Sequence, residues 1–220
     1  MKIYKEILQQ SDEWYRLRYG KIGGSTLKHL MTGKAVTDCA IYNELLSARM
    51  EEYEYEDNYM SPDMERGNAY EPLARMEFER LNNIVVDQYG WLELDNGIAG
   101  ISPDGIIGSK FWEACEIKCP SRNTHMSYIR NPISMVEEYI WQVVQYFLVI
   151  DKLKKLYFLS YRPENKSKKL LTFEVTRKTV VRLSSKEVDS IENLVKKAKY
   201  RLKQLDSALI KDISIYLPQF

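Results

Sequence analysis

Hydrophobic residues follow a helical spacing in the first third of the chain. From Asp12 to about Leu81, apolar positions recur every three or four residues, as they do on the buried face of a helix. Ser61 followed by Pro62 is a typical N-cap and first-turn pair, because serine can accept from free backbone N–H groups and proline fits the first helical turn. The pattern predicts a long helix over 62–81.

Strand-like segments follow this helix. IVVDQYGWLEL (84–94), GIAGISPDGII (97–107) and WEACEIKCP (112–120) are rich in β-forming residues and are separated by glycine and Asn-Gly signals. They predict three strands of a meander. KLYFLSY (155–161) and LLTFEV (170–175) predict two further strands.

Capping signatures predict two more helices. Ser134 with Glu137 forms a capping box that opens an apolar run, which predicts a buried helix over 134–150. The same signature at Ser184 predicts a long basic helix over 184–206.

The order of these elements predicts the fold class. Helices followed by β-β-β-α-β-β-α indicate α/β (α+β) architecture, with a central mixed β-sheet flanked by helices. A chain of 220 residues fits one domain, 1–220. We expect it to comprise a helical N-terminal part (about 1–81), a strand-rich core and the basic C-terminal helix, with one active site.

Composition excludes disorder but does not by itself indicate nucleic acid. With 45% hydrophobic and 29% charged residues, the chain is typical of soluble globular proteins. Its 32 Lys and Arg against 31 Asp and Glu give a formal net charge of +1. Residues 152–203, however, hold 16 basic and five acidic residues, a segment that either attracts phosphate or forms a solvated face.

Several other classes are disfavoured. The first residues lack the apolar core of a signal peptide, and no run of about 18 apolar residues predicts a membrane span, so we expect a cytoplasmic protein. Cys39, Cys115 and Cys119 contain no CxxC pair, which argues against disulfides and zinc and predicts reduced thiols. His29 and His125 are too few and too far apart in sequence for an obvious metal pair.

Three charged residues in the strand-rich part carry candidate chemistry. Asp104 follows one predicted strand, and Glu116 and Lys118 occupy alternate positions of the next, so they share one face of it. Neighbouring strands can therefore present all three together. Burial of Glu116 and Lys118 in an apolar strand is costly unless they form an ion pair or bind a metal, and both alternatives remain open.

A metal interpretation favours phosphodiester chemistry. Two carboxylates with a main-chain carbonyl and waters suit magnesium or manganese. Such an ion polarises a phosphate and acidifies a water, while Lys118 would orient or help deprotonate that water and balance charge in the transition state.

These residues and four flanking motifs, in this order along the chain, resemble the phage lambda exonuclease and YqaJ-type viral recombinase family of PD-(D/E)xK nucleases. The motifs are WYRLRYGKIGGS (14–25), RGNAYEP (66–72), SPDG (102–105) with EIK (116–118), CP (119–120) and QVVQY (142–146).

The resemblance implies a restriction-endonuclease-like core and a processive 5′ to 3′ exonuclease. Such an enzyme digests one strand of linear duplex DNA to leave a 3′ single-stranded tail for recombination by strand annealing. It implies two magnesium ions, replaceable by manganese, held by Asp104, Glu116 and the Ile117 main-chain carbonyl, with Lys118 acting on the attacking water. It also implies a ring-shaped homotrimer, a single-strand annealing protein as partner, and the cytoplasm of a bacterial host.

The same resemblance implies further site residues. Glu71 would add a carboxylate at the edge of the metal site, the alternative being a helix-surface glutamate. Gln142 would position the lysine or the scissile phosphate, with Gln145 as its rival and a buried structural amide as the alternative. Arg18 and Ser25 would bind the 5′ phosphate, a role that suits an arginine fork and a hydroxyl near a helix N-terminus; Ser25 is otherwise an N-cap.

Two rival functions remain open. An endonuclease of the same fold would cut circular DNA, whereas an end-dependent exonuclease cannot. A non-catalytic DNA-binding module would have no need of buried carboxylates that repel phosphate. Arg122 either contacts DNA or is simply exposed, and the tryptophans, including Trp112, are interpreted as core residues.

Overall fold

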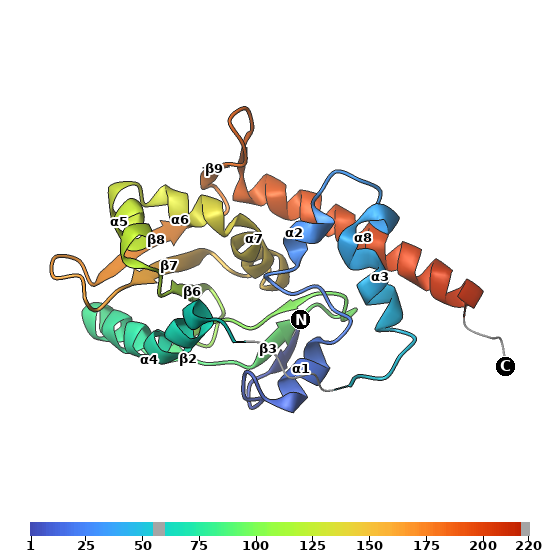
Figure 1. The fold of residues 1–220 in the computed structure, drawn as a ribbon, viewed down its shortest axis with the longest axis horizontal. Helices are drawn as coiled ribbons and strands as arrows, with labels where there is room; N and C mark the ends of the chain where they lie inside the picture. Colours follow the sequence, from blue (N-terminus) through green and yellow to red (C-terminus); the bar gives the residue numbers. More distant parts are fainter. Residues whose placement is uncertain (55–59, 217–220) are drawn as a thin grey trace.

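A mixed five-stranded sheet lies at the centre of the computed structural model, which describes residues 1–54 and 60–216 (Figure 1). Its strand order is β2-β5-β6-β7-β8. β6 and β7 are parallel, and the other neighbouring pairs of this sheet are antiparallel. The predicted α/β architecture is confirmed. The strands are β2 (Val86–Asp87), β5 (Gly105–Ile107), β6 (Glu113–Lys118), β7 (Lys155–Tyr161) and β8 (Leu170–Val175).

Helices join β6 to β7, since parallel neighbours cannot be connected by a tight hairpin. This crossover contains α5 (Arg122–Arg130), α6 (Ile133–Glu138) and α7 (Ile140–Val149). No helix in the described part of the chain has the length and apolar content needed to span a bilayer. The remaining helices are α1 (Asp12–Arg18), α2 (Leu27–Leu30), the 3-10 helix η1 (Val36–Asp38), α3 (Ala40–Ser47), α4 (Pro62–Asn82) and α8 (Ile191–Tyr216).

Helices cover both faces of the central sheet, with α4 on one side and α5 to α7 on the other (Figure 1). Alternate residues of β6 therefore meet different helices. Cys115 and Ile117 pack with Ala74 and Phe78 of α4, whereas Ala114 belongs to the core that contains α7. The even-numbered positions of β6, including its two charged ones, consequently face α7.

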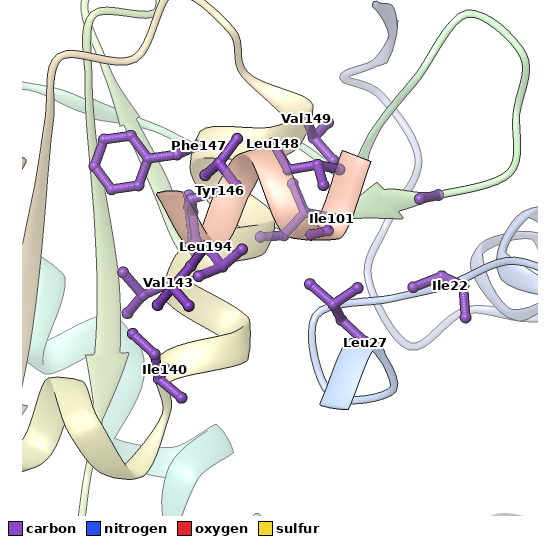
Figure 2. Packing of buried hydrophobic residues seen from close by; sticks show 14 of the residues in the cluster. Ile22, Leu27, Ile101, Ile140, Val143, Tyr146, Phe147, Leu148, Val149 and Leu194 are labelled. Carbon is purple, nitrogen blue, oxygen red and sulfur yellow. The ribbon is translucent and has the colours of Figure 1, made fainter. Parts of the chain in front are cut away.

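The larger hydrophobic core surrounds α7, which is buried along almost its whole length. Figure 2 shows Val143 of this helix beside Leu194 of α8, while Ile22 and Leu27 of the N-terminal segment approach Ile101. A helix that is apolar on nearly every side is fixed in place by hydrophobic contacts on all of those sides. α7 is therefore a rigid support for any polar group that it carries.

A second, antiparallel sheet was not predicted and lies beside the predicted meander, which is formed by β2, β5 and β6 of the central sheet. The order of the second sheet is β1-β3-β4, so the first two β-rich segments each contribute short strands to two different sheets. The chain changes sheet at Gly90, where a Cβ atom would lie 2.1 Å from the main-chain oxygen of Ile7, a contact that only glycine avoids. The strands are β1 (Lys2–Tyr4), which was not predicted, β3 (Trp91–Glu93) and β4 (Gly100–Ile101).

The predicted buried helix that begins at Ser134 is two helices, α6 and α7. The break is at Tyr139, whose φ and ψ angles are −108° and 28°. Ser134 donates its hydroxyl to the Asn131 carbonyl at 2.7 Å, and Glu137 accepts from a main-chain N–H of the β9–β10 hairpin at 2.9 Å. The predicted capping box is therefore wrong, because both side chains have other partners.

The basic C-terminal helix begins later than predicted. Ser184 and Glu187 lie in the turn of a hairpin, where the Ser184 N–H donates to the Glu187 carbonyl at 3.3 Å. Cross-strand pairing satisfies the backbone here instead of a helix, and α8 begins only after the hairpin ends. The hairpin strands are β9 (Val180–Arg182) and β10 (Val188–Ser190).

Other boundaries are confirmed. α4 begins after Ser61, whose hydroxyl oxygen accepts from the Met64 N–H at 3.2 Å, and β7 and β8 have the predicted bounds. α5 was not predicted. Residues 55–59 of the expected helical N-terminal part, and 217–220, lie outside the described residues.

Candidate functional site

A cleft of about 940 Å³ opens between α1, α4, the end of β6 and the start of α5. Four of the predicted site residues line it: Arg18, Glu71, Asp104 and Lys118. Ile117 also lines the cleft. Segments that are far apart in sequence thus converge on one concave site, the usual form of an active site.

A carboxylate–lysine cluster adjoins the cleft: Asp104 and Lys118 line it, and Glu116 is buried beside Lys118. An Asp104 carboxylate oxygen accepts from the Ile117 N–H at 2.7 Å, which joins the loop before β5 to β6. Lys118 Nζ lies 2.6 Å from Glu116 Oε1, as expected for alternate residues on one strand face. The structure therefore brings Asp104, Glu116 and Lys118 together.

Tyr146 of α7 supports this cluster from behind and was noted in sequence only as part of the Gln142 motif. Its hydroxyl lies 2.8 Å from Glu116 Oε2 and 3.1 Å from the Cys115 carbonyl, and accepts from the Asp104 N–H at 3.1 Å. Burial, together with the two carboxylates, raises the pKa of Tyr146 well above its ordinary value. The phenol therefore stays neutral and can donate a proton to a hydrogen bond with Glu116.

Arg75 of α4 is a second supporting residue, and sequence reasoning missed it. Its side chain is only 8% exposed. Nε donates to the Asp104 main-chain carbonyl at 2.9 Å, and Nη2 donates to Glu71, one helical turn earlier. One guanidinium thus connects the carboxylate on α4 to the loop that carries Asp104. Only the spacing of four between Glu71 and Arg75 hinted at this pair.

The electrostatics of the cluster are those of a cation site. Burial raises the pKa of Asp104 well above its ordinary value, and Glu116 and Glu71 add to the effect. Burial also raises the pKa of Glu71, which Arg75 opposes. Burial alone would lower the pKa of Lys118, but Glu116 and Asp104 outweigh it and the net shift is upwards. Three carboxylates crowd here around a lysine that remains charged.

The donor chemistry fits a hard divalent cation. Asp104 and Glu116 supply carboxylate oxygens, and the Ile117 carbonyl points to the same sheet edge as its N–H, which already meets Asp104. Within residues 1–54 and 60–216, however, no three His, Cys, Asp or Glu side chains stand in a group that could hold a metal. Glu116 and Glu71 are engaged by Lys118, Tyr146 and Arg75, so ligation requires an exchange of these partners.

The two candidate glutamines of α7 have different surroundings. Gln145 is fully buried, and its amide nitrogen donates to the Ile22 and Gly100 carbonyls at 3.1 and 2.9 Å, which joins the N-terminal segment to β4. Gln142 packs against Gly24, and the buried amide oxygens of both glutamines have no hydrogen-bond partner among the described residues. The amide nitrogen of Gln145 thus has a structural role, whereas the Gln142 side chain forms no hydrogen bond within the described residues.

Arg18 has the environment of an anion-binding residue. Its guanidinium stacks on Trp14, 3.8 Å from the ring centroid, and lies 5.6 Å from that of Trp91. Burial lowers the pKa of Arg18 to about 10. No carboxylate in the described part of the chain forms an ion pair with it. Trp14 donates to Ser102 at 2.7 Å, which fixes this stack near Asp104.

Ser25 does not share this environment. It is exposed in the turn before α2 and does not line the cleft. The N-cap of α2 is Thr26, so the alternative N-cap assignment of Ser25 is wrong. The hydroxyl of Thr26 accepts from the Gly23 N–H at 2.8 Å instead of capping the helix.

The remaining candidates lie outside the cluster. His125 is buried between Ser160 and the Lys168 carbonyl, 2.8 Å from each, and burial lowers its pKa. The three cysteines are free, as expected. Trp112 is 40% exposed and packs against Lys154, so its assignment to the core is wrong.

Comparisons with known proteins identify a family and a shared fold. The sequence model of a family described as "YqaJ-like viral recombinase domain" matches residues 13–152. No individual curated protein matches the chain.

Solved structures share the fold. The alkaline exonuclease LHK-Exo from Laribacter hongkongensis, also solved in complex with dAMP, superposes with a TM-score of 0.70 at 23% identity, over 93% of this chain and 95% of its own. A phage-related exonuclease from Haemophilus somnus 129PT superposes with a TM-score of 0.61 at 12% identity, over 90% of this chain and 96% of its own.

Proposed function

The chain belongs to the YqaJ-like viral recombinase domain family, and we propose that it is a magnesium-dependent exonuclease of DNA recombination. It degrades one strand of linear duplex DNA from the 5′ end and leaves a 3′ single-stranded tail. The observation that carries this proposal is the cluster of Asp104, Glu116 and Lys118, in which Asp104 and Lys118 line the cleft and Glu116 is buried beside Lys118.

Asp104, Glu116 and the Ile117 carbonyl would hold the metal, with Glu71 at the edge. A bound magnesium ion supplies Lewis acidity for the phosphate and an acidified water, and a second ion or manganese fits the same oxygen donors. The crowding that raises the pKa of Asp104 supports this assignment, since a divalent cation relieves carboxylate repulsion.

Lys118 would act on the attacking water and on the phosphate. Its ammonium faces the cleft beside Glu116 and lies 4.6 Å from the Tyr139 ring centroid, so packing and an ion pair restrict its position. A positioned ammonium orients a water and stabilises charge that develops on the phosphate. Gln142, with its unpartnered amide oxygen, would help to position the lysine or the phosphate.

Arg18 would bind the 5′ phosphate of the strand being digested, with Ser25 as a second contact. A buried guanidinium that lacks a protein anion gains a partner when a phosphate enters the cleft. Arg18 and Lys118 line the same cleft, which supports a phosphate held by Arg18 near the reacting end.

Replacing Arg18 by Lys should remove the preference for a 5′-phosphorylated end. Lysine keeps the charge but loses the planar fork and the stacking on Trp14. We expect digestion of a 5′-phosphorylated duplex to slow about 10- to 100-fold, with little change on a 5′-hydroxyl duplex. Arg16→Lys is the matched control, because Arg16 lies on the same helix but is exposed and paired with Asp12. An unchanged ratio of the two rates in Arg18→Lys would contradict the assignment.

We also propose a ring-shaped homotrimer, a single-strand annealing partner and the host cytoplasm as the setting. A ring around DNA gives processivity by topological linkage, which suits a chain of net charge +1. Light scattering of the purified protein, with and without duplex DNA, should give three times the chain mass of 25.9 kDa; a monomer under both conditions would contradict the ring.

End-labelled DNA tests the proposed activity. A linear, 5′-phosphorylated duplex is labelled separately on each end of each strand and incubated beside a closed circular duplex. Loss of the 5′ labels first, with the circle intact, supports the exonuclease and its polarity. A cut circle would favour an endonuclease of the same fold, and binding without cleavage under any divalent metal would favour a non-catalytic module.

A further inference from the structure

A strip of positive charge lies directly outside the cleft, on α5 and on the hairpin between β7 and β8. We propose that Arg122, Arg130, Lys166 and Lys168, here named the basic rim, bind the phosphate backbone of the duplex part of the substrate, away from the cleaved end. This inference rests on the proposed function and assigns to these residues a task separate from catalysis.

Arg122 and Arg130 lie on one face of α5. Positions 122, 126 and 130 are each four apart, so their side chains share a helix face. Met126 on this face contacts Asn165 of the hairpin, with the amide nitrogen 3.6 Å from its sulfur. The two arginines thus flank the place where the hairpin meets the helix.

The hairpin is held against α5 by buried contacts. His125 hydrogen-bonds to the Lys168 carbonyl and to Ser160 of β7, both at 2.8 Å. Arg162 donates to the Pro120 carbonyl at 3.2 Å. These contacts fix the hairpin backbone while the side chains of Lys166 and Lys168 remain exposed. The rim is therefore a preformed surface.

Its charge is not balanced by the protein. The stretch from Cys119 to Val136 contains no Asp or Glu. The one acid of the hairpin, Glu164, is engaged by Arg66, which lies 3.0 Å away, and by Arg162. None of the four rim side chains forms an ion pair with any residue that the structure describes.

Three lysines near the start of α8 provide the contrast. Lys196, Lys197 and Lys199 each lie within 4 Å of a carboxylate, and Lys197 is 2.8 Å from Asp189. Exposed lysines are usually solvated or paired in this way. A cluster of four cations without counter-charges is instead suited to a polyanion, because phosphate contacts release condensed counterions from DNA.

The position of the rim fits a duplex rather than a small phosphate ligand. Arg122 follows Ser121, which lines the cleft, so the rim starts at the cleft edge. α5 has nine residues, which corresponds to about 13 Å along its axis. That length matches about four base pairs of B-DNA. A DNA end in the cleft would therefore place neighbouring backbone phosphates over the rim.

The test compares two full-length variants that each lose four exposed positive charges. The rim variant carries Arg122→Gln, Arg130→Gln, Lys166→Gln and Lys168→Gln. The control variant carries glutamine at four exposed lysines that also lack ion pairs within the described residues but lie on other elements: Lys178, Lys186, Lys203 and Lys211. Both sets are on the surface, so neither should affect folding, which circular dichroism verifies.

Binding is measured in EDTA by fluorescence anisotropy over a range of salt concentrations, with a labelled duplex and with one of its single strands. For the rim variant at about 100 mM salt, we expect the Kd for duplex to rise about 100-fold and the slope of log K against log salt to fall by about four. The control should change much less, and kcat at saturating DNA should stay within about twofold of wild type in both.

Three outcomes would overturn the inference. If the rim variant binds duplex as the control does while the wild type digests DNA, the rim has no such role and the proposed function stands. A larger loss on the single strand than on the duplex would contradict the duplex assignment. A wild-type protein that neither binds nor cleaves DNA would overturn both the inference and the proposed function.

Discussion

Replacing Asp104 by Asn is expected to lower the rate of DNA cleavage by about 1,000-fold or more. Asparagine has nearly the same shape and can still accept from the Ile117 N–H, but it lacks the charge that a divalent cation requires. The rate is measured as nucleotides released from linear duplex under saturating magnesium. Because the substituted residue is half-buried and nearly isosteric, the variant should remain folded.

Lys118→Met is the companion change, and it separates two roles. Methionine fills a similar volume without the ammonium, so cleavage should fall by a similar factor. Manganese affinity, followed by electron paramagnetic resonance of the free ion, should fall in Asp104→Asn and not in Lys118→Met. Both variants should bind duplex with a Kd within a few-fold of wild type. Cleavage at more than about a tenth of the wild-type rate in either variant would contradict the assigned chemistry.

Arg75→Met should lower both the free energy of unfolding and the metal affinity, and we expect this to be the second-largest effect after the loss of cleavage in Asp104→Asn. Removing the guanidinium leaves Glu71 without its partner and the Asp104 carbonyl without its donor. Loss of one member of such a pair costs about 2 kcal/mol in the free energy of unfolding, allowing for the partial exposure of Glu71. Supporting residues of this kind typically contribute 10- to 100-fold in metal affinity.

Arg80→Met is the matched control for Arg75. Arg80 is on the same helix and pairs with Glu77, but it is 66% exposed and lies nine positions after Glu71. Urea unfolding should show a change of less than about 0.5 kcal/mol for this variant. Manganese affinity, measured well below the unfolding temperature, should fall in Arg75→Met and be retained in Arg80→Met.

Arg75→Lys should recover only part of the manganese affinity that Arg75→Met loses, since one ammonium cannot replace both guanidinium donors. If Arg75→Met, Arg75→Lys and Arg80→Met all bound manganese with the same affinity, Arg75 would have no role in metal binding and would be a purely structural residue.

Local sequence rules were sufficient for part of the site. Glu116 and Lys118 share a strand face because side chains alternate along a strand, and that depends on no distant contact. The apolar pattern and the Ser61-Pro62 pair likewise located α4, which carries Glu71. The assignments of Glu71 and Arg18 came from motif order, and the structure places both in the same cleft as Lys118.

Other features depend on contacts that no local pattern contains. Arg75 meets Asp104 across 29 positions, and Tyr146 meets Glu116 across 30. The capping signature at Ser134 failed because Glu137 accepts a tertiary hydrogen bond from the Arg182 N–H, and the signature at Ser184 failed because that serine lies in a hairpin turn. The second sheet was not predicted, because the first two β-rich segments each divide between two sheets, and that division depends on tertiary packing such as the close approach at Gly90 rather than on strand propensity.

The most direct test of the central claim is a single digestion followed in time. Wild-type protein is mixed with uniformly labelled linear duplex and magnesium, EDTA is then added in excess, and magnesium is finally restored, while acid-soluble nucleotides are counted throughout. The carboxylate–lysine cluster predicts release that stops with EDTA and resumes with magnesium. Release that continues in EDTA, or no release with any divalent metal, would contradict a metal-dependent exonuclease at this site.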